Sequence, residues 1–234
     1  MSIWDHLEEL RRRVFISMGA IFLGTTGCFF YSAKILEFLT RPLLKVVGHF
    51  YFFSPQEAFL TRLKAAFISG ILVSAPVWVW QIWAFVSPAL LVREKKTFVP
   101  LVVLILLLFF AGAFFSYYLV LPVGLEFLVS MQTPFLEPMI SITQYLDFIL
   151  MMLLGFGFAF NLPVLVLALA FMRILNTRML NHYQKHAIVL IFILAAMLTP
   201  GPDIASQLLL AIPLLCLFEM SVFAVWILEV RRRS

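Results

Sequence analysis

Long, almost unbroken apolar stretches alternate with short polar segments along most of this chain. A helix needs about 20 mainly apolar residues to cross a hydrocarbon core of about 30 Å. The pattern therefore predicts an all-α integral membrane protein that forms one membrane domain over residues 1–234. The six transmembrane helices it predicts lie at about residues 14–32, 65–87, 97–121, 144–172, 186–199 and 204–228.

The fifth predicted span is short. Its apolar part of about 12 residues reaches about 18 Å at a rise of 1.5 Å per residue. The segment Thr199-Pro-Gly-Pro-Asp203 separates it from the sixth span, and this composition cannot continue a helix. We expect a tight turn there, and a bilayer that is thinned beside the fifth helix unless longer helices shelter it.

Composition agrees with a membrane protein, because 63% of the residues are hydrophobic and 12% are charged, against roughly a quarter in soluble domains. The basic residues form short clusters beside apolar runs, so the net charge of +5 does not indicate nucleic-acid binding. Most of them lie at the two termini and in the loops after the second and fourth spans. The positive-inside rule then predicts that both termini are cytoplasmic.

Two outer loops are expected to cap the outer ends of the spans. In residues 33–64, apolar positions interleave with charged ones, which predicts an amphipathic surface helix bent at Pro42. Residues 122–143 contain several prolines and two glutamates.

Two carboxylates near the N-terminus need an explanation. Glu8 and Glu9 precede three arginines at the predicted membrane edge, where arginines alone would serve as topology signals. Each can pair with the arginine four residues later, a contact worth about 0.2–0.5 kcal/mol. That accounts for Glu8, but for Glu9 we favour binding, because Glu94 lies on the same predicted face. The alternative for Glu94 is a solvated charge cluster with its three basic neighbours.

Three further polar residues lie in or beside apolar spans. Asn161, in the fourth span, either faces a ligand or satisfies a carbonyl near Ala159 that Pro163 leaves without a donor. Asp203 is placed to cap the sixth helix at its N-terminus. Gln207, one turn further on, is suited to an interhelical hydrogen bond.

Motifs of catalysis are missing from the sequence. The four histidines lie in tails or loops or, for His186, at the first residue of the fifth predicted span, and there is no HExxH motif, membrane-embedded Ser–His pair or phosphate-binding glycine loop. Cys28 and Cys216 lie in apolar segments and are expected to be packing residues. We therefore predict no enzyme activity, no catalytic residue, no metal and no cofactor.

Four short motifs occur in order and in register along essentially the whole chain. Together they closely resemble the TatC family, the multispanning receptor subunits of the twin-arginine protein translocase. Each motif alone is weak, whereas the ordered set is specific. The motifs are His6-Leu-x-Glu-Leu-Arg11, Ser54-Pro55, Phe85-x-x-Pro88-Ala-Leu with Glu94-Lys-Lys96, and Thr199-Pro-x-Pro-Asp203-x-x-Ser-Gln207 followed by Ala211-Ile-Pro213.

The resemblance implies a concave six-helix bundle in a bacterial cytoplasmic membrane, with signal peptides that carry paired arginines bound at the cytoplasmic face. A guanidinium pairs bidentately with a carboxylate, and lysine cannot reproduce that geometry. The residues it assigns to signal-peptide binding are Glu9, Arg11, Phe85, Pro88 and Glu94.

The same resemblance implies assembly with single-span TatA and TatB partners, self-association, and export of folded proteins driven by the proton-motive force. Asn161, Asp203 and Gln207 are the expected partner or translocation residues, and Pro42, Pro163 and Pro213 the structural prolines. The family usually has Glu where this chain has Asn161, which argues against proton handling there. The main alternative is a secondary transporter or channel for a small solute or ion, with Asn161 and Gln207 lining its site.

Overall fold

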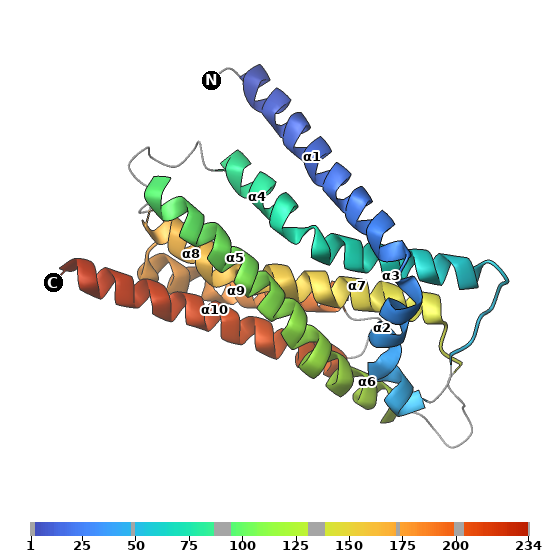
Figure 1. Ribbon diagram of the computed structural model, residues 1–234. Helices are drawn as coiled ribbons and strands as arrows, with labels where there is room; N and C mark the ends of the chain where they lie inside the picture. Colours follow the sequence, from blue (N-terminus) through green and yellow to red (C-terminus); the bar gives the residue numbers. More distant parts are fainter. Residues whose placement is uncertain are drawn as a thin grey trace. The chain divides into compact units, whose positions relative to one another are not determined.

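A computed structural model describes residues 3–47, 50–86, 95–130, 139–171, 174–198 and 204–233 (Figure 1). Almost all of these residues are helical. The elements, in order, are α1 (Ile3–Phe29), α2 (Ser32–Val47), α3 (Glu57–Val73), α4 (Ala75–Val86), α5 (Lys95–Phe115), the π-helical turn η3 (Ser116–Val120), α6 (Leu121–Ser130), α7 (Ile142–Ala159), α8 (Leu162–Phe171), α9 (Thr177–Leu198) and α10 (Ile204–Arg233).

The helices have the length and composition of membrane spans, which confirms the predicted all-α membrane protein. Among the described residues, Val102–Phe127, Ile142–Ala170 and Leu210–Arg231 are each long and apolar enough to cross a bilayer. The bent pairs α1–α2 and α3–α4 raise this number to five if each pair is one span. Helix α9 includes most of the predicted fifth span, and its first half is polar whereas its second half is apolar.

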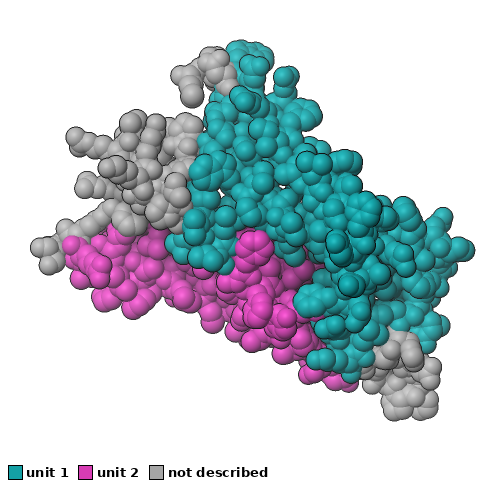
Figure 2. Space-filling view, in the orientation of Figure 1, with its two compact units in different colours: residues 1–107, 139–147 teal, residues 108–138, 148–234 magenta. Residues whose placement is uncertain are grey.

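The chain folds as two compact units (Figure 2). The first contains residues 1–107 and 139–147, and in it α1 packs against α3 and α4 while α2 packs against α3. The second contains residues 108–138 and 148–234, and in it α10 packs along α8 and α9 and also contacts α6.

Helix α1 meets α3 where neither helix has a side chain to separate the backbones. A Cβ atom added to Gly24 would lie 2.8 Å from the carbonyl oxygen of Gly70, and one added to Gly70 would lie 2.6 Å from Thr25 Cα. In the second unit, a Cβ atom on Gly157 of α7 would lie 2.6 Å from the Phe109 ring of α5. Small residues thus allow the close helix packing that membrane proteins use in place of a hydrophobic driving force.

The second predicted span, residues 65–87, is longer than expected and is broken. Helix α3 begins at Glu57, and α4 leaves it at an angle of 54° after Ser74. The break has a cause in Pro76, which cannot donate a backbone hydrogen bond and clashes with the preceding turn. Trp78 compensates, because its indole N–H donates to the Ile71 carbonyl at 2.9 Å.

Helix α2 is the predicted amphipathic helix, and it leaves α1 at an angle of 91°. Leu39 and Leu43 are buried on one face, while Lys34, Glu37 and Arg41 are exposed. The predicted proline, Pro42, is buried inside the helix.

The start of α7 packs against α2 and the segment that follows it in the first unit. The Tyr145 hydroxyl donates to the Leu39 carbonyl at 3.1 Å, and Tyr51 forms an isolated parallel β-bridge with Ser141. These two contacts join α2 and the segment at Tyr51 to the start of α7.

The third predicted span ends later than residue 121. In the turn η3, the backbone N–H of Leu121 donates to the Ser116 carbonyl, five residues earlier. Pro122, which has no N–H to donate, lies two residues after the end of this wider turn, and the helix continues to Ser130 as α6.

Replacing Gly70 by Ala is expected to destabilise the first unit by about 1–3 kcal/mol, because the new Cβ atom would overlap the α1 backbone at Thr25. Thermal unfolding of the purified protein in detergent measures this effect. Gly19→Ala is the matched control, since a Cβ atom at Gly19 meets nothing within 4 Å. Equal melting temperatures for the two variants would contradict the close α1–α3 contact.

Candidate functional site

A polar pocket of about 650 Å³ lies between the charged first turns of α1 and the second half of α4, within the first unit. It is half open to its surroundings and brings together side chains about 70 positions apart in the sequence. The residues that line it are Glu8, Glu9, Arg12, Arg13, Ile16, Trp80 and Gln81.

Arg13 connects the two walls of this pocket. Its Nη2 and Nε atoms donate to one carboxylate oxygen, Glu9 Oε1, at 2.6 and 3.0 Å. Its Nη1 atom donates to Gln81 Oε1 on α4 at 3.2 Å. The Arg13 and Glu9 side chains are only 24% and 23% exposed, so the contact is more sheltered than an ordinary surface ion pair.

An apolar pocket of about 390 Å³ adjoins the polar one and shares Arg13 and Gln81 with it. Its other lining residues come from both helices and are almost all apolar. They are Leu10, Val14, Ser17, Met18 and Ile21 on α1, and Trp78, Ile82 and Phe85 on α4.

An aromatic contact holds α1 to the end of α4. The His6 and Phe85 rings stack with their centroids 4.4 Å apart and their planes 18° from parallel. Phe85 therefore serves both as a wall of the apolar pocket and as a docking point for the charged end of α1.

The structure brings Glu9 and Phe85, two of the predicted binding residues, to the same groove. Arg11 is exposed on α1, and Pro88 and Glu94 lie outside the described residues. One expectation is wrong: the i,i+4 salt bridge forms at Glu9, whereas Glu8 makes none within the described part of the chain.

Asn161 lies at the break between α7 and α8. Its Nδ2 atom donates to the Gly157 carbonyl at 2.9 Å, so the satisfied carbonyl is that of Gly157 rather than Ala159. Its Oδ1 atom is buried and has no hydrogen-bond partner among the described residues. Pro163 lies in the first turn of α8, where its missing N–H ends the α7 ladder.

Gln207 forms the expected interhelical hydrogen bond, with its Nε2 atom 2.8 Å from the Phe192 carbonyl of α9. It also lines an open, mostly apolar pocket of about 460 Å³ along α9. Pro213 lies inside α10 and is half-buried. Asp203, the expected N-cap, lies outside the described residues.

An ion pair that sequence reasoning missed joins α3 to α7 in the first unit. Lys64 Nζ lies 2.6 and 2.7 Å from the two carboxylate oxygens of Asp147. The sequence did carry a signal for it, because Asp147 is an acidic residue within a predicted span and such residues usually have a partner. Gln81, another polar residue within a predicted span, carried the same signal.

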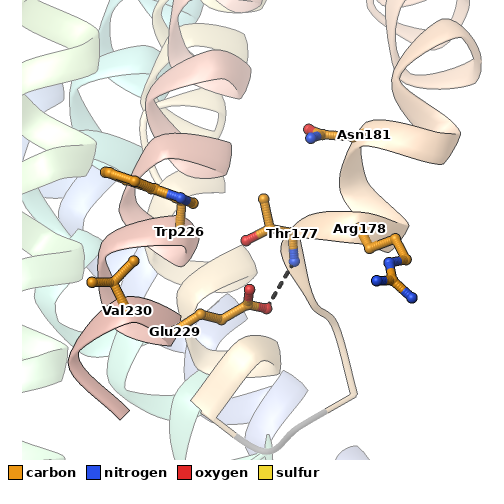
Figure 3. Close-up of a pocket in the computed structure, with 6 residues that line it drawn as sticks. All are labelled: Thr177, Arg178, Asn181, Trp226, Glu229 and Val230. Atoms are coloured by element: carbon orange, nitrogen blue, oxygen red, sulfur yellow. Dashed lines mark hydrogen bonds between the residues drawn. The ribbon is translucent and has the colours of Figure 1, made fainter. Parts of the chain in front are cut away.

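A smaller pocket of about 380 Å³ lies between the start of α9 and the end of α10 (Figure 3). Glu229 of α10 points toward α9, and its Oε1 atom accepts the backbone N–H of Thr177 at 2.9 Å. Arg178 extends away from Trp226 and Glu229. The carboxylate thus caps the N-terminus of α9, where negative charge is favourable, and joins the two helices.

Comparison with known proteins shows which protein family this chain belongs to. A family model described as "Sec-independent protein translocase protein (TatC)" matches residues 5–213. The chain belongs to the TatC family. The match includes every site residue named from the sequence, and a protein translocase family gives no support to the alternative of a small-solute transporter or ion channel.

Individual TatC proteins are similar over nearly their whole length. The Sec-independent protein translocase protein TatC of Carboxydothermus hydrogenoformans is 40% identical over 95% of this chain and 92% of its own. That of Helicobacter pylori strain J99 is 39% identical over 93% and 86%. A crystal structure titled as the twin-arginine translocase receptor TatC, in DDM, has a TM-score of 0.85 at 34% identity and covers 94% of this chain and 99% of its own.

Replacing Gln207 by Leu is expected to destabilise the α9–α10 contact by about 0.6–2 kcal/mol, the worth of an interhelical hydrogen bond in a membrane. The Phe192 carbonyl would lose the hydrogen bond from Gln207 that joins the two helices. Thermal unfolding compares this variant with Gln144→Leu, a change at an exposed glutamine of α7. A loss no larger than that of the control would contradict the role of this bond.

Proposed function

We propose that this chain recognises signal peptides with paired arginines at its cytoplasmic face and assembles with TatA- and TatB-type single-span proteins to export folded proteins with the proton-motive force. One observation carries the proposal: a sheltered carboxylate, Glu9, lies in a polar pocket beside an apolar one, in a member of the TatC family. The similar crystal structure is titled as a twin-arginine translocase receptor, which supports it.

The chain itself contains an example of the recognition chemistry. The Arg13 guanidinium donates twice to Glu9, with the planar group directed at one carboxylate oxygen. Charge-assisted bonds of this type are roughly twice as strong as neutral ones. A lysine ammonium presents three donors around a point and lacks the planar fork, so a pocket shaped for guanidinium distinguishes the two residues.

The two adjoining pockets match the two parts of a signal peptide. Such peptides begin with a positively charged segment, which is followed by an apolar segment of about 7–15 residues. The charged part fits the pocket that contains Glu9, and the start of the apolar part fits the pocket lined by Phe85 and Met18.

Two arginines need two acceptors, and we assign the second to Glu94. It follows α4 in the sequence, and the distribution of basic residues predicts that it lies on the same side of the membrane as the N-terminus. Pro88 would shape that loop, and Arg11 would contribute to the same surface. Phe85 has the additional role of holding α1 against α4 through His6.

Partner binding is assigned to the other end of the chain. Gln207 lines the open apolar pocket along α9, and the apolar part of α9 is short for a span. A short helix favours a thinned bilayer, where the transmembrane helices of partner proteins can gather. Asn161 and Asp203 are assigned to the same translocation function.

Replacing Glu9 by Gln is expected to weaken binding of an Arg-Arg signal peptide by about 10-fold to 150-fold, the loss expected for a hydrogen bond to a charged group. Fluorescence anisotropy with the purified full chain and labelled peptide measures the dissociation constant. Glu8→Gln is the matched control, because Glu8 lines the same pocket and makes no ion pair within the described residues.

In this comparison, a Lys-Lys peptide should bind weakly to the parent and lose little in the Glu9 variant. If the Glu9 and Glu8 variants bind the Arg-Arg peptide as well as the parent does, the site assignment is wrong.

Inserting one turn of leucines into the apolar half of α9 is expected to reduce transport several-fold while signal-peptide binding is retained, because the bilayer beside α9 would no longer be thinned. Export of a folded reporter from cells measures transport. The control replaces the same number of existing α9 residues by leucine, which keeps the length constant. Unchanged transport in the lengthened variant would refute the role of the short helix.

A further inference from the structure

The contact between Glu9 and Arg13 is one-sided. Both Arg13 nitrogens that reach the carboxylate bind the same atom, Oε1. The other oxygen, Oε2, makes no hydrogen bond within the part of the chain that the structure describes. Arg13 therefore occupies half of the carboxylate and leaves the other half to the polar pocket that Glu9 lines.

The third nitrogen of Arg13 fixes the direction of its guanidinium. Nη1 donates to Gln81 on α4, so the planar group is held at both ends, by Glu9 on its own helix and by an amide on the neighbouring one. A guanidinium that donates in two directions has little rotational freedom left, and the carboxylate it holds is fixed with it.

Glu9 needs such a partner. About three quarters of its side chain is out of contact with solvent, and a sheltered carboxylate is costly unless it is paired and hydrogen-bonded. Arg13 supplies the charge and the hydrogen bonds through Oε1 alone. Oε2 is left without a hydrogen-bond partner among the described residues.

We propose that Arg13 is a positioning residue of the signal-peptide site: with Gln81 as its anchor on α4, it holds Glu9 so that Oε2 receives a guanidinium of the peptide. The inference rests on the proposed function, since it names how that carboxylate is aimed. Its consequence is selectivity. A carboxylate oxygen held in a fixed position favours the planar donor geometry of arginine. A mobile carboxylate would bind lysine almost as well as arginine.

A double-mutant cycle tests whether Arg13 acts through Glu9. The parent, Arg13→Gln, Glu9→Gln and the double variant are titrated as full chains with labelled Arg-Arg and Lys-Lys signal peptides. Arg13→Gln is expected to weaken Arg-Arg binding about tenfold, on the scale of one charge-assisted bond. In the Glu9→Gln background, the same change should alter binding by about twofold or less, the usual limit of additivity.

Two further variants separate positioning from charge and from folding. Arg13→Lys keeps the positive charge, but a single ammonium cannot donate to Glu9 and Gln81 in the geometry of the guanidinium, so it should lose Arg-over-Lys selectivity as Arg13→Gln does. Gln81→Leu leaves the Glu9–Arg13 pair in place and should give a smaller loss of selectivity. Melting temperatures identify any variant that has lost its fold. If the Arg13 variants do not fold, the selectivity of Gln81→Leu for the Arg-Arg peptide over the Lys-Lys peptide decides the test.

The outcomes are distinct. If Arg13→Gln weakens binding equally in both backgrounds, or if Arg13→Lys binds with full selectivity, Arg13 contributes only structure or charge and the inference fails. If Arg13→Gln tightens Arg-Arg binding, Arg13 competes with the peptide for Glu9, which also overturns it. If Glu9→Gln alone does not weaken binding, the proposed site itself is wrong. If Glu9→Gln weakens binding but the effects of the two substitutions are additive, only the positioning role of Arg13 is refuted.

Discussion

A polar group inside hydrocarbon has no water to bind, so each donor and acceptor must find a partner within the protein. This constraint explains the irregular places in an otherwise helical chain. Where Pro76 breaks the second span, the Trp78 indole donates to a freed carbonyl. Where Pro163 separates α7 from α8, Asn161 donates to the Gly157 carbonyl. Between α9 and α10, the Gln207 side chain finds its partner in the Phe192 carbonyl of the neighbouring helix.

The candidate site lies where this constraint is relaxed, at the charged end of α1. There a carboxylate is paired with a fixed cation, and it also lines a pocket that a ligand can enter. The apolar pocket beside it has the opposite chemistry, although the two share Arg13 and Gln81. The groove therefore changes from polar to apolar along its length. A peptide with a charged and an apolar part is matched to such a change along its length.

The spans could be predicted from the sequence because apolar length alone determines them, and the amphipathic α2 because charged and apolar residues alternate along it. The partner of each charged residue could not be predicted from the sequence. Glu8 and Glu9 have the same spacing to an arginine, and only the position of α4, which presents Gln81 to Arg13, distinguishes them. Lys64 and Asp147 are 83 residues apart, so their pairing depends on how α3 packs beside α7. The break at Pro76 was not predicted, because residues 65–87 were expected to form one continuous span, and its angle depends on packing.

Position 161 shows how one substitution changes what a polar residue can do. The hydrogen bond at the α7–α8 break needs a donor, because its acceptor is the Gly157 carbonyl. A glutamate, which the family resemblance leads one to expect there, can donate only when it is protonated, whereas an amide donates at every physiological pH. Asn161 thus holds the break permanently, at the cost of one buried oxygen without a partner among the described residues. An amide has no proton to exchange at physiological pH, so Asn161 itself cannot relay protons, and any coupling to the proton-motive force must involve other groups.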